Sequence, residues 1–342
     1  MPIVSVIDPH EVARRAGLVH VDVRTLPIVR RRCGSGFSYV GPDARVVRGP
    51  ERARIDALAI PPAWRQVRVA ADDRCHVQAV GVDDEGRTQY RYHEAFRAAA
   101  DEAKFARLGE LGEALPRLRR AVRDRLRACG DDADGTSDIA AVIALIDATS
   151  MRVGSERYAE TNESFGATTL RRRHVTRTDR GLRFVFTAKA GIERDLILSD
   201  PDIVEPIWRC HVRGTGADDR LFRGPEGGIV SGDTVARWLT TWSGIEMTAK
   251  ELRTWGATAT MVVRLMDPDP TPTAASDDPV LAAYDGVAER LGNTRDVARS
   301  SYVAPRVVEA HESGELAALW RGSRSSALFT RGEQCCRKLF AT

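Results

Sequence analysis

The sequence predicts an α+β fold, with a small β-rich N-terminal domain at residues 1–94 and a mostly helical domain at residues 95–342. Three observations carry this prediction. A chain of 342 residues suggests about two domains with a sizeable core. Before about residue 94, short strand-like runs alternate with turn residues. After it, apolar residues recur at helical spacing, with one β insertion.

In the N-terminal part, Asp8 and Pro9 have the types expected for the cap and first position of a short helix that Gly17 ends. A second short helix is predicted at 51–58, before the pair Pro61 and Pro62. Gly, Pro and Asp turns separate the strand-like runs. These runs lie at residues 26–29, 36–40, 66–70, 76–82 and 88–92.

The helical part is predicted to begin with a helix that Pro116 opens, with an apolar stripe formed by Leu118, Val122, Leu126 and Cys129. Ser137 is a candidate cap for a helix at 138–149, which is apolar nearly all round and therefore expected to be buried. Ser155 is a candidate cap for a helix at 156–162.

The β insertion consists of a hairpin, 174–178 with 182–187, and a further strand at 193–198. Lys189 lies at the tip of the turn that joins the last two strands. Helices resume near residue 200 and at 233–241.

Another helix starts at Thr248, where Thr248-x-x-Glu251 forms a capping box. Lys250 and Arg253 share a face of its first turns. The proline-rich stretch 267–273 reads as a loop. Asp278 and Pro279 restart a helix that runs to residue 291.

Composition limits the possible functions. The net charge is only +3, which does not by itself indicate a polyanion partner. Arginines cluster at 117–127 and 171–183, and such local patches suit either a phosphate-binding face or an ordinary solvated surface. The six cysteines form no CxxC pair or zinc spacing, which is typical of a cytoplasmic protein. The N-terminus has no signal-peptide core, and no apolar run is long enough to span a bilayer.

Only four of the 51 basic residues are lysines: Lys104, Lys189, Lys250 and Lys338. Arginine stays protonated in proteins, whereas lysine can release a proton when its surroundings lower its pKa. A lysine retained in so arginine-rich a chain is therefore a candidate proton donor, although chance survival is an equal alternative on this observation alone.

Five polar side chains stand at unusual places: Arg152, Lys189, Arg253, Asn293 and Tyr302. Each alone is explained as well by a surface, capping or core role. Together they have one chemical meaning. Two guanidinium groups and an amide can stabilise a phosphoryl-transfer transition state without a metal. A tyrosine can act as the nucleophile and a lysine as the proton donor to a leaving alkoxide.

The order and surroundings of these residues resemble the type IB DNA topoisomerases, in particular the compact poxvirus-like form found in bacteria. The resemblance covers residues 37–305. Its motifs are FSYVGP at 37–42, IDALAIPPAW at 55–64, GRTQYRYH at 86–93, MRVG at 151–154, FVFTAK at 184–189, TAKELRTW at 248–255, and LGNT at 291–294 with SY at 301–302.

The resemblance implies that the second domain is catalytic and that the two domains clamp duplex DNA. Tyr302 would attack the scissile phosphodiester and form a 3′-phosphotyrosyl intermediate. Arg152, Arg253 and Asn293 would hold the transition state, and Lys189 would protonate the 5′-oxygen. The family has His or Asn at the position of Asn293. Because the covalent bond keeps the energy of the broken one, relaxation of positive and negative supercoils would need no ATP.

The resemblance also implies that Gln89, Tyr90 and Tyr92 belong to a strand that meets the major groove of DNA. Strand alternation places Tyr90 and Tyr92 on one face and Gln89 on the other. A half-buried edge strand is the alternative for the tyrosines. Lys250 is expected to touch DNA near the cleavage site, with a plain surface lysine as the alternative.

Three residues depart from the family pattern. Thr88 stands where relatives often have Lys, Ala188 where a Gly is expected before the catalytic lysine, and Ala304 where His is frequent. None of them removes a catalytic group. The departures therefore bear on site preference and on the mobility of the Lys189 turn.

No cofactor or metal is expected, because the sequence has no GxxxxGK[ST] motif and no acidic cluster spaced for Mg²⁺. A monomer in the cytoplasm, associated with the nucleoid, is expected. Two rival interpretations are a tyrosine recombinase and a non-catalytic DNA-binding protein. Recombinases usually have His-x-x-Arg where this chain has Lys250-x-x-Arg253, and they lack the β-rich N-terminal half.

Overall fold

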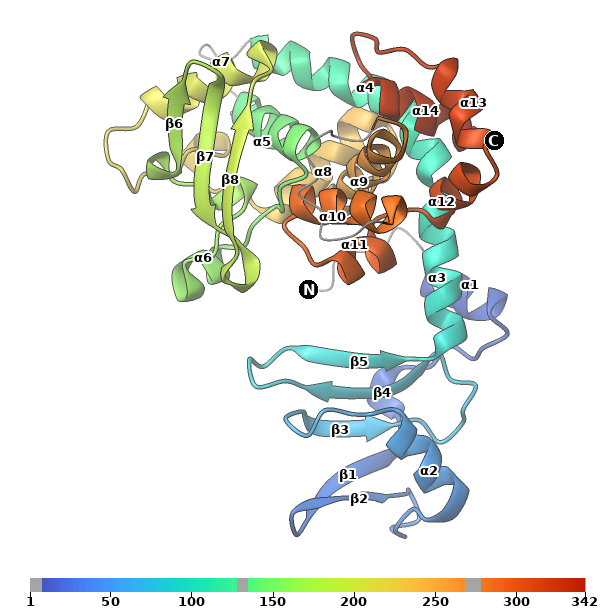
Figure 1. The fold of residues 1–342 in the computed structure, drawn as a ribbon. Coiled ribbons are helices and arrows are strands. Elements are labelled where there is room, and N and C mark those ends of the chain that lie inside the picture. The colour runs from blue at the N-terminus through green and yellow to red at the C-terminus, as the bar shows by residue number, and fades with distance from the viewer. Residues whose placement is uncertain (1–7, 128–134, 268–277, 342) are drawn as a thin grey trace. The chain divides into compact units, whose positions relative to one another are not determined.

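The computed structural model describes residues 8–127, 135–267 and 278–341. Within these residues the chain forms two compact units, one ending at Ala106 and the other beginning at Arg107 (Figure 1). The first unit contains a five-stranded sheet and the second is mostly helical with a three-stranded sheet. This arrangement confirms the predicted α+β class. The assignment of domains to 1–94 and 95–342 stays a prediction.

The sheet of the first unit is antiparallel, with strand order β2-β1-β3-β4-β5. Its strands are β1 (Ile28–Cys33), β2 (Gly36–Val40), β3 (Arg65–Val69), β4 (Val77–Val82) and β5 (Thr88–Tyr92). β4 lies inside the sheet and is almost wholly buried, whereas β5 forms an edge on which exposed and half-buried residues alternate. The prediction placed β2 and β5 at their observed bounds and the others within two residues at most ends, but β1 runs four residues further.

Three helices accompany this sheet: α1 (Pro9–Arg15), α2 (Gly49–Ala57) and α3 (Glu94–Ala106). Ile55 of α2 is fully buried against Ile28, Val67 and Val69 of the sheet. The Asp8 carboxylate caps α1 as predicted. Phe96 of α3 packs against α1, so α3 belongs to the first compact unit.

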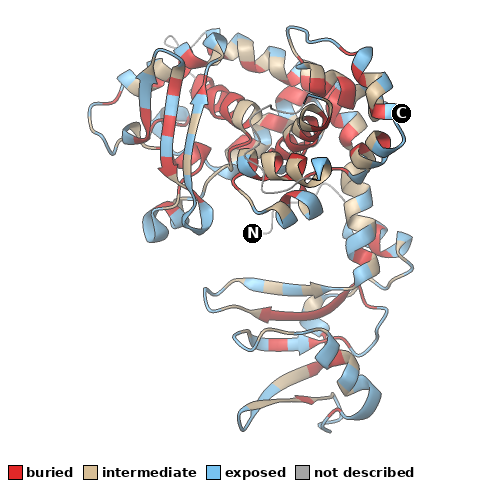
Figure 2. Ribbon diagram, in the orientation of Figure 1, coloured by how far each residue is buried: buried red, intermediate tan, exposed pale blue. Residues whose placement is uncertain are grey.

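The second unit is built around α5 and α9, whose buried residues stand out in Figure 2. The helices α4, α7 and α8 pack on α5, while α10 and α14 pack on α9. The helices are α4 (Leu108–Arg127), α5 (Thr136–Thr149), α6 (Glu156–Asn162), α7 (Pro201–Val212), α8 (Gly232–Ser243), α9 (Ala249–Met266), α10 (Pro279–Leu291), α11 (Arg295–Ser301), α12 (Pro305–Glu312), α13 (Glu315–Arg321) and α14 (Arg331–Leu339).

The β insertion forms a separate antiparallel sheet of order β6-β7-β8, with β6 (Val175–Thr178), β7 (Gly181–Thr187) and β8 (Glu193–Leu198). Alternate residues of β7, Leu182, Phe184 and Phe186, are buried. Because β7 contacts α7 and β8 contacts α5, this sheet lies against the helical body, as Figure 1 shows.

Two predicted helix starts are wrong. Pro116 lies inside α4, which begins at Leu108. Burial of Leu108, Leu111 and Leu115 on the same side extends the helix upstream of the proline. α5 begins at Thr136, before the expected cap Ser137, which is itself buried in the first turn.

Gly135 explains the early start of α5. It takes a left-handed conformation with φ of 67°, and an added Cβ would lie only 2.7 Å from the Cα of Pro225.

Ser155 occupies the expected capping position of α6 but makes no side-chain capping bond. Cys129 and residues 268–273, for which the sequence also made predictions, lie outside the described residues.

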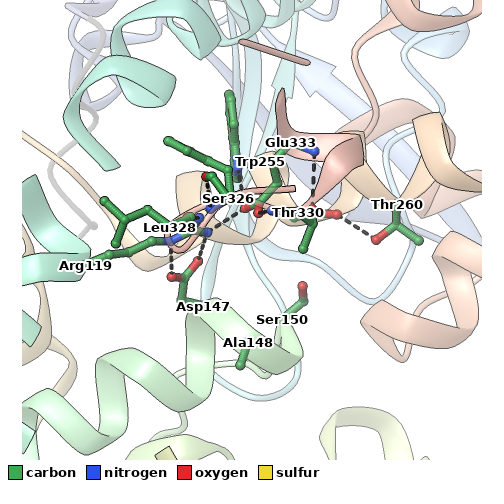
Figure 3. A network of polar contacts seen from close by, with 12 residues as sticks. Arg119, Asp147, Ala148, Ser150, Trp255, Thr260, Ser326, Leu328, Thr330 and Glu333 are labelled. Carbon is green, nitrogen blue, oxygen red and sulfur yellow. Dashed lines mark hydrogen bonds and ion pairs between the residues drawn. The ribbon is translucent and has the colours of Figure 1, made fainter. Parts of the chain in front are cut away.

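Four side chains far apart in sequence tie the last helix to the body of the second unit (Figure 3). The Arg119 guanidinium pairs with Asp147 at 2.7 Å and with Glu333 at 2.5 Å. The Trp255 indole donates to the same Glu333 carboxylate at 2.9 Å. α14 is thereby joined to α4, α5 and α9.

Candidate active site

Arg152 is placed by the turn that follows α5. Ser150 ends the helix in a left-handed conformation with φ of 57°, and Arg152 comes two residues later. The Arg152 carbonyl accepts a bond from the Ala167 amide at 2.8 Å, which fixes this segment against a neighbouring loop. Gly154 allows the close approach, since its φ is 106° and an added Cβ would lie 2.8 Å from Thr169 Oγ1.

Arg253 lies on α9, one turn after the capping box of Thr248 and Glu251 that the sequence predicted. Its side chain is 5% exposed. The guanidinium donates through Nε to the Ser150 carbonyl at 2.8 Å and through Nη1 to the Tyr302 hydroxyl at 2.8 Å. Arg253 therefore joins the end of α5 to the candidate nucleophile.

Asn293 and Tyr302 flank α11. Gly292 ends α10 with φ of 60°, the conformation that favours glycine after a helix, and Asn293 follows. Thr294 caps α11, and Tyr302 lies at its other end, 9% exposed. The Arg253 guanidinium carbon is 4.8 Å from the centre of the Tyr302 ring.

The carboxyl end of α10 gathers these groups. Arg253 Nη2 donates to the Leu291 carbonyl at 3.4 Å, and Arg152 Nη2 donates to the Gly292 carbonyl at 3.1 Å. Arg152 also donates to Asn293 Oδ1. Carbonyl groups at a helix end carry partial negative charge and attract cations. Arg152, Arg253, Asn293 and Tyr302, which the sequence selected from four distant segments, are thus brought together.

One polar atom in this cluster lacks a partner. Asn293 Nδ2 is buried and makes no hydrogen bond with any residue that the structure describes. A buried N–H group without an acceptor is costly and uncommon in native proteins. The Asn293 amide is therefore a donor available to a ligand oxygen.

Burial also shapes the charges. Burial lowers the pKa of both Arg152 and Arg253, and the Tyr302 phenol opposes this shift. Guanidinium groups nevertheless keep their protons, because the delocalised cation is not deprotonated in proteins. The cluster holds two fixed positive charges close to one phenol, which suits a dianionic phosphorus centre more than a neutral substrate.

Lys189 makes no hydrogen bond to this cluster in the described structure. It is exposed at the start of the turn between β7 and β8 and makes no hydrogen bond or ion pair within the described parts of the chain. The left-handed residue of the turn is Ala190, with φ of 65°, whereas Ala188 is buried with φ of −100°. The missing glycine at 188 therefore causes no backbone strain.

The candidate DNA-contacting strand is β5. Tyr90 and Tyr92 are 40% and 41% exposed and stack on one face, with ring centres 5.6 Å apart, while Gln89 lies on the other face. This confirms the predicted alternation. The Gln89 side-chain amide donates one hydrogen bond to Asp83 at 2.9 Å, which leaves its second N–H and its oxygen for a base edge. Lys250 is exposed in the first turn of α9.

Aromatic rings support Tyr92 from behind. Phe96 stacks on Tyr92 with ring centres 5.3 Å apart, and the buried His76 ring lies next to Phe96. Burial lowers the pKa of His76 to about 4, and the stacked His20 adds to this shift. His76 is therefore a neutral ring at physiological pH and acts as part of the core beneath the β5 surface.

Sequence reasoning missed three residues that border the site. Ser150 presents its carbonyl to Arg253 and its hydroxyl to Arg290. Arg194 of β8 donates to carbonyls at the end of α10. No local pattern distinguishes these residues, because their partners lie about 95 to 140 positions away along the chain.

Several arginines of the two predicted clusters bond to other groups of the chain. Arg119 is half-buried and pairs with two carboxylates, and Arg172 donates to the carbonyls of His211 and Gly216. Arg177 and Arg183 pair with Glu205 and Asp195. Arg120 and Arg180 are exposed. The clusters therefore contain both exposed arginines and arginines that bond within the chain.

Among the residues that the structure describes, no group of three or more His, Cys, Asp or Glu side chains is arranged to hold a metal ion. Within the same residues, none of the helices has the length and apolar character needed to cross a membrane.

Comparisons with known proteins agree with this geometry. Residues 93–315, more than half of the chain, match the family model described as eukaryotic DNA topoisomerase I, catalytic core. Residues 36–83 match the model of the bacterial DNA topoisomerase IB N-terminal domain. A DNA topoisomerase 1B of Acanthamoeba polyphaga mimivirus is 29% identical over 300 residues, which cover 84% of this chain and 88% of the relative.

Proposed function

The chain belongs to the type IB DNA topoisomerases, and we propose that it relaxes positive and negative supercoils through a transient 3′-phosphotyrosyl bond at Tyr302. Membership of this family makes DNA its substrate and isomerisation of DNA topology its reaction class. The tyrosine recombinase and the non-catalytic DNA-binding protein are therefore set aside. The residue roles and the independence from ATP and metal are the parts that we propose.

The observation that carries the proposal is the hydrogen bond of 2.8 Å between Arg253 Nη1 and the Tyr302 hydroxyl. It holds the phenol oxygen beside a guanidinium group that is already fixed by the Ser150 and Leu291 carbonyls. A scissile phosphate at this oxygen would meet a prearranged cation. Such prearrangement stabilises developing charge without further reorganisation.

In the proposed reaction, Tyr302 Oη gives its proton to solvent water and bonds to phosphorus while the bond from phosphorus to the 5′-oxygen breaks. Arg152 and Arg253 neutralise the non-bridging oxygens, and Asn293 Nδ2 donates its unused hydrogen bond to one of them. The positive charges perform the role that metal ions perform in many phosphoryl transfers. The 5′-hydroxyl restores the strand by the reverse step, which needs no ATP.

We assign the proton for the leaving 5′-oxygen to Lys189. An alkoxide is a poor leaving group unless a proton reaches it in the transition state. Lys189 is exposed on a hairpin turn, so its ammonium group is accessible to a bound substrate. The exposed Lys250 and the tyrosines of β5 are proposed to contact DNA.

Three further points complete the proposal. Two units that each contribute DNA contacts would clamp the duplex. No cofactor is required by the chemistry above. A monomer with a cytoplasmic, nucleoid-associated location remains the expectation from the sequence.

A plasmid relaxation assay tests the function. Wild-type protein should relax both positively and negatively supercoiled plasmid in EDTA without ATP, because fixed arginines supply the positive charge. Complete loss of relaxation in EDTA would contradict the mechanism.

Tyr302→Phe should bind DNA yet form no covalent adduct on denaturing gels. Tyr158→Phe, a change at an exposed tyrosine of α6, is the matched control and should behave as wild type. A trapped adduct in Tyr302→Phe would place the nucleophile elsewhere.

A further inference from the structure

Arg194 is a half-buried arginine that the reaction outlined above does not use. It lies on β8, directly opposite Phe186 of β7. Its side chain leaves the small sheet and reaches α10. Nη1 donates to the Glu289 carbonyl at 2.6 Å, and Nη2 donates to the Arg290 carbonyl at 2.7 Å.

These contacts are at the same helix end that orients the catalytic arginines. Arg194 donates hydrogen bonds to the carbonyls of residues 289 and 290. Arg253 donates to the Leu291 carbonyl, and Arg152 donates to the Gly292 carbonyl. Three guanidinium groups thus share one set of free carbonyls. Arg194 forms no ion pair with a carboxylate in the described residues, so backbone carbonyls are its anchors.

Gly292 makes this approach possible. A Cβ on residue 292 would lie 2.8 Å from Arg194 Nη1 and 3.1 Å from its Cδ. The absence of a side chain therefore admits the guanidinium to the turn that carries Asn293. Arg194 is therefore closely packed against residue 292, where only a residue without a side chain leaves room for the guanidinium group.

The hairpin that carries Arg194 also carries Lys189. The β7–β8 ladder runs through the pairs Phe186 with Arg194 and Thr187 with Glu193, and the Ala188 amide continues it by donating to the Ile192 carbonyl at 2.7 Å. Lys189 begins the turn directly beyond this last pair. A shift of Arg194 relative to α10 would therefore move the Lys189 turn with it.

We propose that Arg194 is a positioning residue for Lys189. Arg194 fastens β8 to the carboxyl end of α10. It thereby holds the turn that carries Lys189 in a fixed position relative to Arg152, Arg253 and Asn293. This inference rests on the proposed role of Lys189 as the proton donor. Arg194 itself need not touch DNA.

The contacts predict a specific kinetic defect. Loss of the tether should let the Lys189 turn move away, while the α10 end keeps Arg152 and Arg253. Proton delivery would fail and transition-state binding would remain. A substrate whose leaving group needs no proton should then react normally.

Single-turnover cleavage of two duplexes tests this. One contains an ordinary phosphodiester and the other a 5′-bridging phosphorothiolate, whose leaving thiol has a pKa of about 8.5 and departs without a proton. Arg194→Ala should cleave the ordinary duplex about ten- to a hundredfold more slowly than wild type. On the phosphorothiolate it should come within about threefold of wild type, and DNA affinity should be unchanged.

Three variants calibrate the result. Lys189→Ala should show the same rescue with a larger initial loss. Arg194→Lys should keep part of the rate, because one ammonium group can bond to a carbonyl but cannot reproduce the planar fork. Arg183→Ala removes an exposed arginine of β7 that pairs with Asp195 on the same hairpin, and it should leave both rates unchanged.

The outcomes separate the two ideas. If Lys189→Ala is not rescued, the proton-donor assignment fails. If Lys189→Ala is rescued while Arg194→Ala stays slow on both duplexes, Lys189 remains the proton donor and the positioning role of Arg194 is overturned. A wild-type rate in Arg194→Ala overturns it as well. Should that variant fail to fold, Arg194→Gln, which keeps one donor group, must show the same rescue pattern.

Discussion

At the scale of single residues, the site depends on donors whose directions are fixed by backbone carbonyls. Arg152 and Arg253 donate some of their N–H groups to carbonyls at the end of α10 and to the Ser150 carbonyl. These bonds restrict the conformations of the two long side chains before substrate binds. Asn293 differs, because its Oδ1 is occupied by Arg152 and its Nδ2 is not.

Asn293→Ala should therefore slow formation of the covalent adduct by about a hundred- to a thousandfold, the effect of losing one donor to a transition-state oxygen. DNA affinity should change little. Single-turnover cleavage under saturating protein measures the effect. Asn293→His should retain part of the rate, since an imidazole N–H can donate to the same oxygen.

The other asparagine of the chain, Asn162, gives a matched control. It is exposed at the end of α6, and Asn162→Ala should cleave at the wild-type rate. A rate within threefold of wild type in Asn293→Ala would show that its amide does not serve the transition state.

At the scale of elements, α14 closes the second unit through one carboxylate. Glu333 completes the capping box of α14 with Thr330, pairs with Arg119 and accepts from Trp255. It is 8% exposed. Removal of a buried charge leaves its partners desolvated and unpaired, which costs more than the pair itself contributes.

Glu333→Ala should thus lower the free energy of unfolding of the second unit by about 3 kcal/mol, measured by urea denaturation. Glu333→Gln should lose less, because the amide can keep the capping box. Glu315→Ala breaks the exposed pair between Glu315 of α13 and Arg306 of α12 and should cost below about 0.5 kcal/mol. Equal losses in Glu333→Ala and Glu315→Ala would contradict the role of the buried network.

Local patterns explain which elements could be predicted. The strand β5, the cap of α1 and the capping box of α9 depend on neighbours in sequence, and all three were found. Pro116 misled the prediction because burial of Leu108, Leu111 and Leu115 in the packed second unit, which no local rule contains, carried α4 through the proline.

The site shows the same division. Arg152, Arg253, Asn293 and Tyr302 were selected because their residue types form one chemical set in a recognisable order. Arg194 was missed because its role comes from carbonyls about 95 residues away. Contacts of that kind depend on the packing of β8 near α10, which no spacing in the sequence reveals.

At the scale of the whole molecule, charge must be judged after folding. The net charge is +3, and many arginines of the two clusters are occupied by carboxylates or carbonyls. Such arginines contribute little to a DNA surface, because their charge is already compensated. Exposed cations without a partner in the described residues, such as Lys250, are better candidates.

Lys250→Ala should weaken DNA binding and reduce the dependence of affinity on salt. Each phosphate neutralised by the protein adds about 0.9 to the slope of log affinity against log salt. Loss of one contact should therefore lower that slope by about 1, whatever the DNA sequence. Fluorescence anisotropy with Tyr302→Phe as background measures binding without cleavage. Arg306→Ala, a change at a half-buried arginine that is paired with Glu315, should leave the slope unchanged. An unchanged slope in Lys250→Ala would remove Lys250 from the DNA surface, because a cation that releases no counterion does not contact phosphate.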